Sequence, residues 1–368
     1  MTELDRIWQG DCLAILPAFE PGSVDLVFAD PPYNLQLERE LWRPNLTKVD
    51  AVDDAWDQFD GLHAYDAFTR GWLEAVRGVM KDTATIWISG TYHNIFRVGA
   101  IMQDIGFWIL NTITWSKPNA MPNFRGTRLK NDVEFVIWAK PAKQGRYTFH
   151  HHPMKRYNAG KQLGCVWKIP LCNGPERLRD VDGSRLHPTQ KPEELLRRII
   201  LASTRPGDVV LDPFLGSGTT AAVARLLRRH WIGIEREARY VEAARQRIEA
   251  VQPLDPGDPL LVAFDQPRPV RVPFRLLIEQ GYLQPGQPLY LDNPPYTAII
   301  LANGQVQVDH LTGSIHQVGA HLKNTPSCNG WTHWFYHDSE TGERHVLDRL
   351  REQVRQNWSD NVNSEQEE

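Results

Sequence analysis

Short apolar runs alternate with amphipathic segments through residues 1–250 of the chain. Runs such as 24–29 and 208–211 are apolar almost throughout, which is typical of strands buried on both faces of a parallel sheet. The runs 108–115 and 133–139 have no long helical pattern between them, so we expect them to pair antiparallel. The pattern predicts an α/β fold with a mixed, mainly parallel, seven-stranded sheet flanked by helices. Strands are expected at 7–9, 24–29, 83–88, 108–115, 133–139, 208–211 and 231–234. Helices are expected at 65–80, 94–105 and 219–229, with one more that starts at 191 and another that ends at 250.

Proline marks the end of this alternation. Six prolines between 252 and 273 disfavour regular structure and predict a linker. After it we expect a small α+β domain with helical segments at 273–280 and 346–355 and strand-like runs that end at 331–336. The acidic end of the chain is expected to be disordered. The predicted division is 1–251, 252–273, 274–357 and 358–368.

Two motifs each follow a buried run. The first is Asp30-Pro31-Pro32-Tyr33, and the second is Asp212-Pro213-Phe214-Leu215-Gly216-Ser217-Gly218-Thr219. Both stand at the carboxyl ends of predicted strands, where open α/β sheets bind ligands. We therefore expect the two motifs to form one site.

The second motif has the features of a nucleoside site. Gly216 and Gly218 permit a tight turn before a helix, and Glu235 ends the next strand, where an acid commonly binds ribose hydroxyls. A structural turn is the alternative use of the two glycines. A diphosphate fits poorly, because GxxxxGK[ST] is absent from the sequence and Asp212 would repel it. An acidic strand end favours a cationic ligand such as S-adenosylmethionine, which carries an ammonium and a sulfonium.

Two further segments are expected at the same site. Asp11 and Cys12 follow the first short strand, and 187–192 opens a helix whose N-terminus suits a carboxylate. Thr189 or Lys191 could bind the carboxylate of the methionine part. The candidate cofactor residues are Asp11, Cys12, Asp30, His187, Thr189, Gln190, Lys191, Asp212, Pro213, Phe214, Gly216, Ser217, Gly218, Thr219 and Glu235.

The first motif suits an amino group conjugated to a ring. Attack by that nitrogen on a methyl group requires it to be drawn toward tetrahedral geometry, which two acceptors aimed at its hydrogens would do. The Asp30 carboxylate and the Pro31 carbonyl are the expected acceptors, and Tyr33 offers a face for a base that has left the duplex. A second copy, Asn293-Pro294-Pro295-Tyr296, follows a run broken by proline and is interpreted as structural. The candidate catalytic residues are Asp30, Pro31, Pro32 and Tyr33.

The charge of the chain is unevenly distributed. The formal net charge is −4, yet residues 117–161 carry ten basic and two acidic side chains. Such a segment has the right sign for phosphates, and its asparagines and aromatic residue are types that read or stack on bases. A basic surface loop without base contacts is the alternative. The candidate DNA-binding residues are His93, Lys117, Asn119, Asn123, Phe124, Arg125, Arg128 and Lys130.

The polar segment 34–61 is expected to lie over the site. Leu41 and Trp42 could act as wedges in a base stack, but the aspartates around them fit a solvated lid or a dimer contact equally well.

Other classes of site are disfavoured. The cysteines Cys12, Cys165, Cys172 and Cys328 are scattered, so we expect reduced thiols and no zinc site, and the histidines lack metal-ligand spacing. No signal peptide or apolar stretch long enough to cross a bilayer is evident. We expect a cytoplasmic protein without a metal.

With these motifs the chain resembles the amino-group DNA methyltransferases, over residues 1–250. The target motif precedes the cofactor motif, which is similar to the permuted beta class, and the segments 11–12 and 187–192 resemble the cell-cycle-regulated adenine methyltransferases that modify GANTC. The C-terminal part resembles a small domain attached to restriction enzymes and methylases.

The resemblance implies a Rossmann-like class I methyltransferase fold with a DNA recognition region at about 110–186. It also implies adenine N6 as the target atom, S-adenosylmethionine as cofactor, double-stranded DNA as partner, association with the nucleoid and a homodimer. Two alternatives remain open: methylation of cytosine N4, and a DNA-binding regulator without catalysis.

Overall fold

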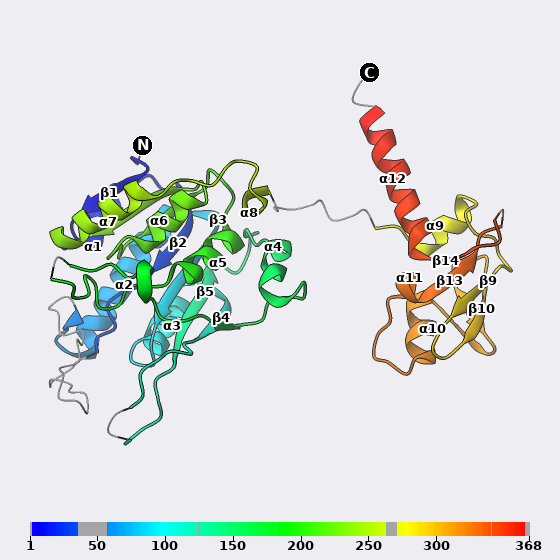
Figure 1. The fold of residues 1–368 in the computed structure, drawn as a ribbon, viewed down its shortest axis with the longest axis horizontal. Helices are drawn as coiled ribbons and strands as arrows, with labels where there is room; N and C mark the ends of the chain where they lie inside the picture. Colours follow the sequence, from blue (N-terminus) through cyan, green and yellow to red (C-terminus); the bar gives the residue numbers. More distant parts are fainter. Residues whose placement is uncertain are drawn as a thin grey trace. The chain divides into compact units, whose positions relative to one another are not determined.

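The apolar run 24–29 forms strand β2 (Val24–Ala29) in the interior of a sheet (Figure 1). The computed structural model describes residues 2–35, 57–123, 126–180, 182–262, 271–339 and 341–364. They form two units, Met1–Asp265 and Gln266–Glu368. Each unit is described by itself.

In the described part of the first unit, eight strands form one sheet in the order β1-β8-β7-β2-β3-β5-β4-β6. Neighbours from β1 to β3 are parallel, whereas β5 is antiparallel to both β3 and β4. The mixed sheet and the antiparallel β4–β5 pair confirm the predictions. The predicted number of seven strands is wrong, because the three residues of β6 pair with β4 at the edge. The strands are β1 (Arg6–Gln9), β2, β3 (Met80–Gly90), β4 (Trp108–Ser116), β5 (Val133–Lys140), β6 (Val166–Lys168), β7 (Val209–Asp212) and β8 (His230–Glu235).

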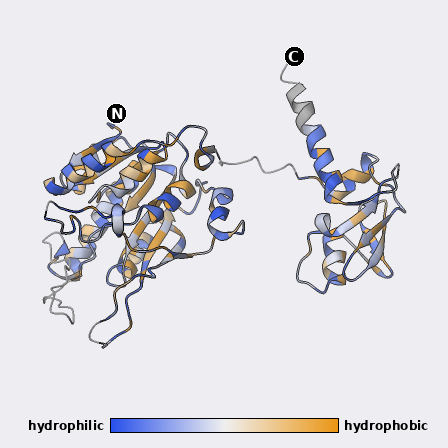
Figure 2. Cartoon of the chain, viewed as in Figure 1, coloured by the Kyte–Doolittle hydropathy of each residue, from blue (hydrophilic) through white to orange (hydrophobic). Residues whose placement is uncertain are grey.

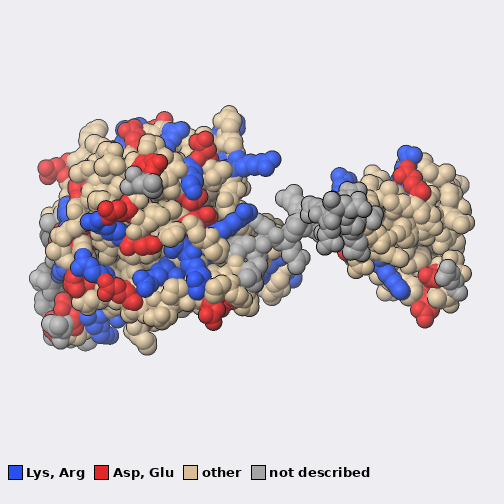
Figure 3. All heavy atoms as spheres, turned by 90° about the horizontal axis from the view of Figure 1, so that it is seen from above, with Lys and Arg blue, Asp and Glu red and all other residues tan. Residues whose placement is uncertain are grey.

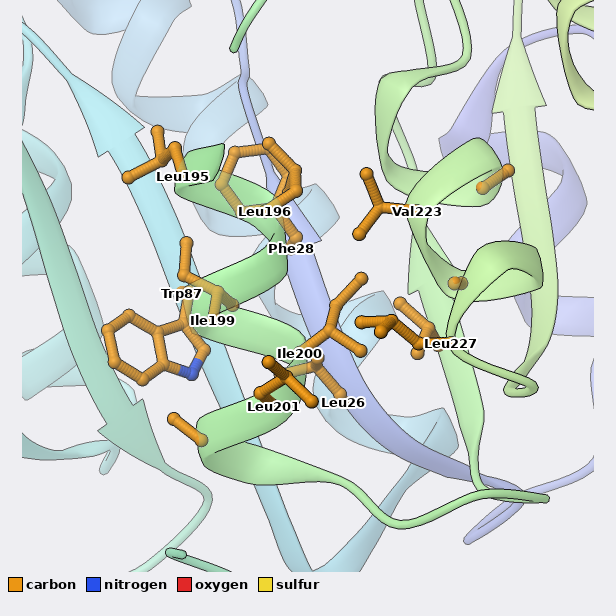
Figure 4. Packing of buried hydrophobic residues seen from close by; sticks show 14 of the residues in the cluster. Leu26, Phe28, Trp87, Leu195, Leu196, Ile199, Ile200, Leu201, Val223 and Leu227 are labelled. Atoms are coloured by element: carbon orange, nitrogen blue, oxygen red, sulfur yellow. The ribbon is translucent and has the colours of Figure 1, made fainter. Parts of the chain in front are cut away.

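Helices cover both faces of this sheet. Leu26 and Phe28 of β2 pack against α5 and α6 on one face, while Val27 and Ala29 pack against α2 and α3 on the other. Figure 4 shows the first of these two cores, and the buried strands are largely orange in Figure 2. Successive side chains of a strand point to opposite faces, so a strand between two cores must be apolar at consecutive positions, as β2 is at 26–29. The helices are α1 (Cys12–Ile15), η1 (Leu16–Ala18), α2 (Gly61–Val79), α3 (Ile95–Asp104), α4 (His151–Lys155), η3 (Arg156–Asn158), η4 (Gly174–Glu176), α5 (Glu193–Ser203), α6 (Thr219–Leu226), α7 (Ala238–Ala250) and α8 (Pro259–Val262).

Strands β2 and β7 lie side by side although they are far apart in the sequence. Leu26 pairs with Val210 and Val27 pairs with Leu211. The helix after β2 packs on one face and the helix after β7 on the other. Such a reversal opens a crevice at the carboxyl ends of the two strands. Both motifs therefore reach the same crevice.

The first half of the predicted linker is packed against the first unit. The backbone N–H of Leu254 donates to the Leu226 carbonyl at 2.9 Å, and Leu261 of α8 is 4% exposed in the core. Proline removes a backbone donor but does not prevent the leucines between prolines from being buried. The prediction of a linker at 252–273 is therefore wrong for residues 252–262, which pack against the first unit. Residues 263–270 lie outside the described part.

The second unit contains an antiparallel sheet in the order β12-β11-β10-β9-β13-β14. Trp331, Trp334 and Tyr336 belong to its buried core, and the second Pro-Pro-Tyr copy leads from β9 into β10, of which Tyr296 is the first residue. The helix predicted at 346–355 extends to Ser364, which corrects the expected disorder at 358–364; residues 365–368 lie outside the described part. Ion pairs three residues apart, such as Arg351–Asp348, support this polar helix. The elements of the second unit are α9 (Phe274–Glu279), β9 (Pro288–Leu291), β10 (Tyr296–Ile300), β11 (Val306–Val308), β12 (Leu311–Gly313), α10 (Ile315–Leu322), α11 (Gly330–His333), β13 (Trp334–His337), β14 (Arg344–Val346) and α12 (Asp348–Ser364).

Candidate active site

A cavity of about 270 Å³ lies at the carboxyl ends of β1, β2, β7 and β8. It is lined by all four residues of the first motif and by every candidate cofactor residue except Gly218. Phe59 and Phe68 form part of its wall; the sequence predicted the segment 34–61 over the site but indicated no role for either aromatic residue. Residues as far apart in the sequence as Asp11 and Glu235 are thus brought together, as the strand pattern predicts.

The two glycines of the second motif have different tasks. Gly216 has a φ of +51°, and its backbone N–H donates to Glu235 Oε2 at 2.7 Å. Gly218 has a φ of +79°, and a Cβ there would lie 2.8 Å from the Cβ of Ala244 on α7. Gly216 therefore shapes the cavity, while Gly218 permits close packing of the following helix.

Buried carboxyl groups give the cavity an acidic character. Asp212 is 3% exposed, and burial raises its pKa to about 7 although the Thr220 hydroxyl and the Phe214 N–H donate to it. Burial also raises the pKa of Glu235, which accepts the N–H groups of Gly216 and Glu237. A positively charged ligand would compensate these buried acids.

The target motif is held by a hydrogen-bonded network. Tyr33 Oη donates to Asp30 Oδ1 at 2.7 Å and lies 3.1 Å from Ser89 Oγ and 3.3 Å from Glu134 Oε2. Burial, followed by the charges of Asp30 and Glu134, raises the pKa of Tyr33 well above its usual value. The phenol therefore stays protonated and orients the Asp30 carboxylate.

Asp57 is a site residue that sequence reasoning missed. Its Oδ1 accepts the backbone N–H groups of Tyr33 at 2.6 Å and Asn34 at 2.8 Å, and its Oδ2 accepts that of Leu35 at 2.9 Å. Asp57 is 3% exposed, whereas the sequence placed it among the solvated aspartates of a lid. The sequence around Asp57 does not indicate this role, because the three N–H groups reach the Asp57 carboxylate only when the chain folds back on itself. The other residues proposed for that lid, 36–56, lie outside the described part.

Lys191 lies where the two halves of the site meet. Its ammonium forms an ion pair with Asp30 Oδ2 and donates to the Thr189 carbonyl at 3.3 Å. The same ammonium lies 5.3 Å from the centre of the Tyr33 ring. Gln190 beside it serves the local fold, since its side chain bonds the backbone of Glu176 and Leu178. His187 is held neutral, because burial lowers its pKa to about 3.

Two candidate DNA-binding residues are corrected by their surroundings. Lys117 is 5% exposed and pairs with Glu134 at 3.0 Å, so its charge is used inside the protein. The side-chain amide of Asn119 accepts the N–H of Leu171 at 2.7 Å and donates to the Leu171 carbonyl at 3.3 Å. Both residues anchor the base of the loop between β4 and β5.

The outer part of that loop keeps the predicted character. Arg128 and Lys130 are exposed, and Arg128 donates to the hydroxyl of Tyr92, which stacks beside His93. Asn123 accepts the N–H of Thr127 at 3.3 Å within the loop. Phe124 and Arg125 lie outside the described residues. On the face shown in Figure 3, acidic and basic side chains are interspersed.

Other chemistry finds no support in the described residues. Burial raises the pKa of Cys12 to about 12, which makes its thiol a poor nucleophile. Within the described ranges, no group of three or more His, Cys, Asp or Glu side chains is arranged to hold a metal ion. In that same part of the chain, every helix is too short or too polar to cross a membrane.

The chain matches two family models. The model described as DNA methylase matches residues 24–246, and the model described as Restriction Enzyme Adenine Methylase Associated matches residues 260–360. These ranges correspond to the two units of the structure.

The chain is also similar to curated proteins and to solved structures. The chain is 42% identical to Type II methyltransferase M.HinfI of Haemophilus influenzae over 332 residues, 90% of this chain and 92% of that protein. It is 39% identical to Type II methyltransferase M2.MboI of Moraxella bovis over 250 residues, 68% and 89% of the two chains. The structure of the cytosine-N4-specific PvuII DNA methyltransferase covers 70% of this chain and 88% of its own, with a TM-score of 0.54 and 22% identity. That last likeness shows the fold alone.

Proposed function

Since the chain belongs to the DNA methylase family and is an S-adenosylmethionine-dependent DNA methyltransferase, we propose that its target is N6 of an adenine flipped out of duplex DNA. The observation that carries the proposal is the adjacency of β2 and β7, which puts Asp30 beside the Gly216 loop in one cavity. The target and the methyl donor can therefore meet there.

The residues of the cavity fit the cofactor. Glu235 Oε2 accepts the N–H of Gly216 and Oε1 that of Glu237, and a carboxylate has further acceptor sites for a ribose hydroxyl. Asp212 and Asp30 supply negative charge near the cationic part, and Phe214 lines the wall. S-adenosylmethionine supplies an electrophilic methyl group on a positively charged sulfur. The chain orients this group and excludes water around it.

The target loop is suited to an exocyclic amine. No hydrogen bond between described residues ends on the Pro31 carbonyl, whereas the Pro32 carbonyl accepts the hydroxyl of Tyr65 at 3.0 Å. The Pro31 oxygen and the Asp30 carboxylate can accept the two N–H groups of the amine. This draws its lone pair out of conjugation as the nitrogen attacks.

Adenine and the recognition sequence GANTC are proposed from the family resemblance. The match of the second unit to the family described as Restriction Enzyme Adenine Methylase Associated supports adenine. The family resemblance also leads us to propose that the protein is a homodimer that binds duplex DNA. Its proposed location is the cytoplasm, at the nucleoid. Exposed Arg128 and Lys130 would bind phosphates of the recognition region.

The experiment is nucleoside analysis of DNA treated with the purified protein and S-adenosylmethionine, followed by sequencing of the modified sites. We expect N6-methyladenine within GANTC. Finding N4-methylcytosine alone would replace adenine by cytosine as the target, and no modified base would favour the regulator. Asp30→Ala should abolish transfer without weakening the binding of S-adenosylhomocysteine, because Asp30 acts on the amine and not on the ribose.

A further inference from the structure

We propose that Lys191 is an exchangeable counter-ion, which pairs with Asp30 in the free enzyme and moves to the methionine carboxylate when the cofactor binds. This makes access of the target amine to Asp30 depend on the cofactor. The inference rests on the proposed function, because it concerns the acceptor that the amine would use. Lys191 is thus a positioning residue and Asp30 the catalytic one.

The Asp30 carboxylate is already engaged at both oxygens. Oδ1 accepts the Tyr33 hydroxyl, and Oδ2 is paired with the Lys191 ammonium. The side chains of Asp30 and Lys191 are 14% and 7% exposed, so solvent screens this pair little. The ammonium also lies 5.3 Å from the centre of the Tyr33 ring, in the space beside the motif. An incoming amine would compete with a full positive charge for Asp30.

The geometry allows Lys191 to change partners. Its backbone carbonyl accepts the Thr219 hydroxyl at 3.3 Å, and the following residues begin α5, so the main chain is anchored. The side chain has four rotatable methylene groups and an ammonium with three donors. Lys191, Asp30 and Gly216 line one cavity, so the ammonium can remain inside it while it moves.

The charges of the cofactor make the exchange favourable. Removing Lys191 alone would leave a buried Asp30 carboxylate without a partner, which is costly. The bound cofactor brings a carboxylate for Lys191 and a positive sulfur for Asp30, so each charge keeps an opposite neighbour. Neutral His187 in the same wall adds no competing positive charge.

The exchange also has a direction. During transfer the nitrogen lone pair forms the new N–C bond, the C–S electrons remain on sulfur, and one N6 proton leaves to solvent. The sulfur is then neutral, so Asp30 loses its positive neighbour. Lys191 is drawn back to Asp30 and displaces the methylated amine. Target binding should therefore respond to the charge at the sulfur position.

Calorimetry tests the carboxylate contact without methyl transfer. Lys191→Met should weaken binding of S-adenosylhomocysteine about tenfold or more, the effect of losing one charge-assisted hydrogen bond. It should leave binding of methylthioadenosine, which lacks the amino-acid part, unchanged. Lys81→Met is the matched control, because Lys81 forms a 2.8 Å pair with Asp25 at the other end of β2. Equal losses for both ligands would overturn the proposal.

Asp30→Asn provides a second, independent variant. It releases Lys191, so S-adenosylhomocysteine should bind more tightly than to the wild type, while methylthioadenosine is unaffected. A merely structural ion pair would predict the opposite sign. Unchanged or weaker binding of S-adenosylhomocysteine would overturn the exchange, whether or not Lys191→Met folds.

A fluorescent base tests the coupling to the target. With 2-aminopurine next to the target adenine, which keeps its N6 amine, the wild type should give a larger emission increase with sinefungin, which carries an amine beside the sulfur position, than with S-adenosylhomocysteine. Lys191→Met should give emission that does not depend on the ligand. Wild-type ligand dependence in that variant would overturn the proposal. Absence of N6-methyladenine would instead refute the proposed function, and the calorimetry would still decide the ion-pair exchange.

Discussion

Asp57 holds the backbone N–H of Tyr33 at 2.6 Å, across 24 positions of sequence. The shape of the target loop therefore depends on a carboxylate outside the motif. Three consecutive N–H groups converge on it, and Asn34 among them has a φ of +55°. Such convergence fixes the direction in which the Pro31 carbonyl points.

Asp57→Asn should impair catalysis more than cofactor binding. An amide has one acceptor oxygen and presents N–H groups where a further acceptor is needed, so at least one buried donor loses its partner. We expect the free energy of unfolding to fall by about 1–3 kcal/mol, and kcat to fall while S-adenosylhomocysteine affinity is kept. Urea unfolding and initial rates measure the two effects. Asp60→Asn, at an exposed position before α2, is the control and should change neither.

Tyr33→Phe should slow methyl transfer by about ten- to a hundredfold, because the ring is kept while the hydroxyl loses its hydrogen bond to Asp30 and its contacts with Ser89 and Glu134. Single-turnover rates with saturating DNA measure this loss. Tyr296→Phe changes the tyrosine of the structural copy, which is 37% exposed, and should leave the rate unchanged. A full rate in Tyr33→Phe would show that Asp30 needs no orientation by the phenol.

Asp212→Asn should change how stability depends on pH. The pKa of Asp212 is about 7 in the folded protein against 3.8 in the unfolded chain, so its contribution is fully present below pH 3.8 and is lost as pH rises through about 7. The variant lacks this loss and should gain Tm relative to the wild type as pH rises from about 4 to above 7. Thermal unfolding across that range measures the difference. A constant difference in Tm would contradict the prediction.

Lys130→Ala should weaken DNA binding and reduce the slope of log K against log salt concentration by about 1, because one phosphate contact is lost. Lys117→Met removes a lysine of the same segment that is paired with Glu134 inside the protein. Its salt slope should match that of the wild type. Titrations at several salt concentrations distinguish the two lysines.

The sheet could be predicted largely because burial on both faces leaves a direct record in the sequence. Both faces of the run 24–29 are buried, so its residues are apolar almost throughout, which predicts a strand with the motif at its end. Strand β6 left no such record, since its three residues alternate between exposed Val166 and Lys168 and buried Trp167. The pattern is too short to distinguish from a loop.

The sequence motifs predict which residues belong to the candidate site, but they do not predict which of these residues contact one another. Gly216 and Glu235 follow from their spacing, but the pairing of Lys191 with Asp30 joins elements 161 positions apart. Lys117 was misjudged for a related reason: a lysine in a basic segment looks exposed until its partner, Glu134, is placed on the neighbouring strand.

Strand β2 pairs with β7, which is synthesised much later along the chain. The N–H of Val209 on β7 donates to Asp25 on β2 across 184 positions. A ribosome needs about 10 to 40 s to make that length, at 5–20 residues per second. A nascent or truncated chain that ends before β7 therefore carries the DPPY motif without the cofactor loop, and we expect activity only from chains whose synthesis has passed β7.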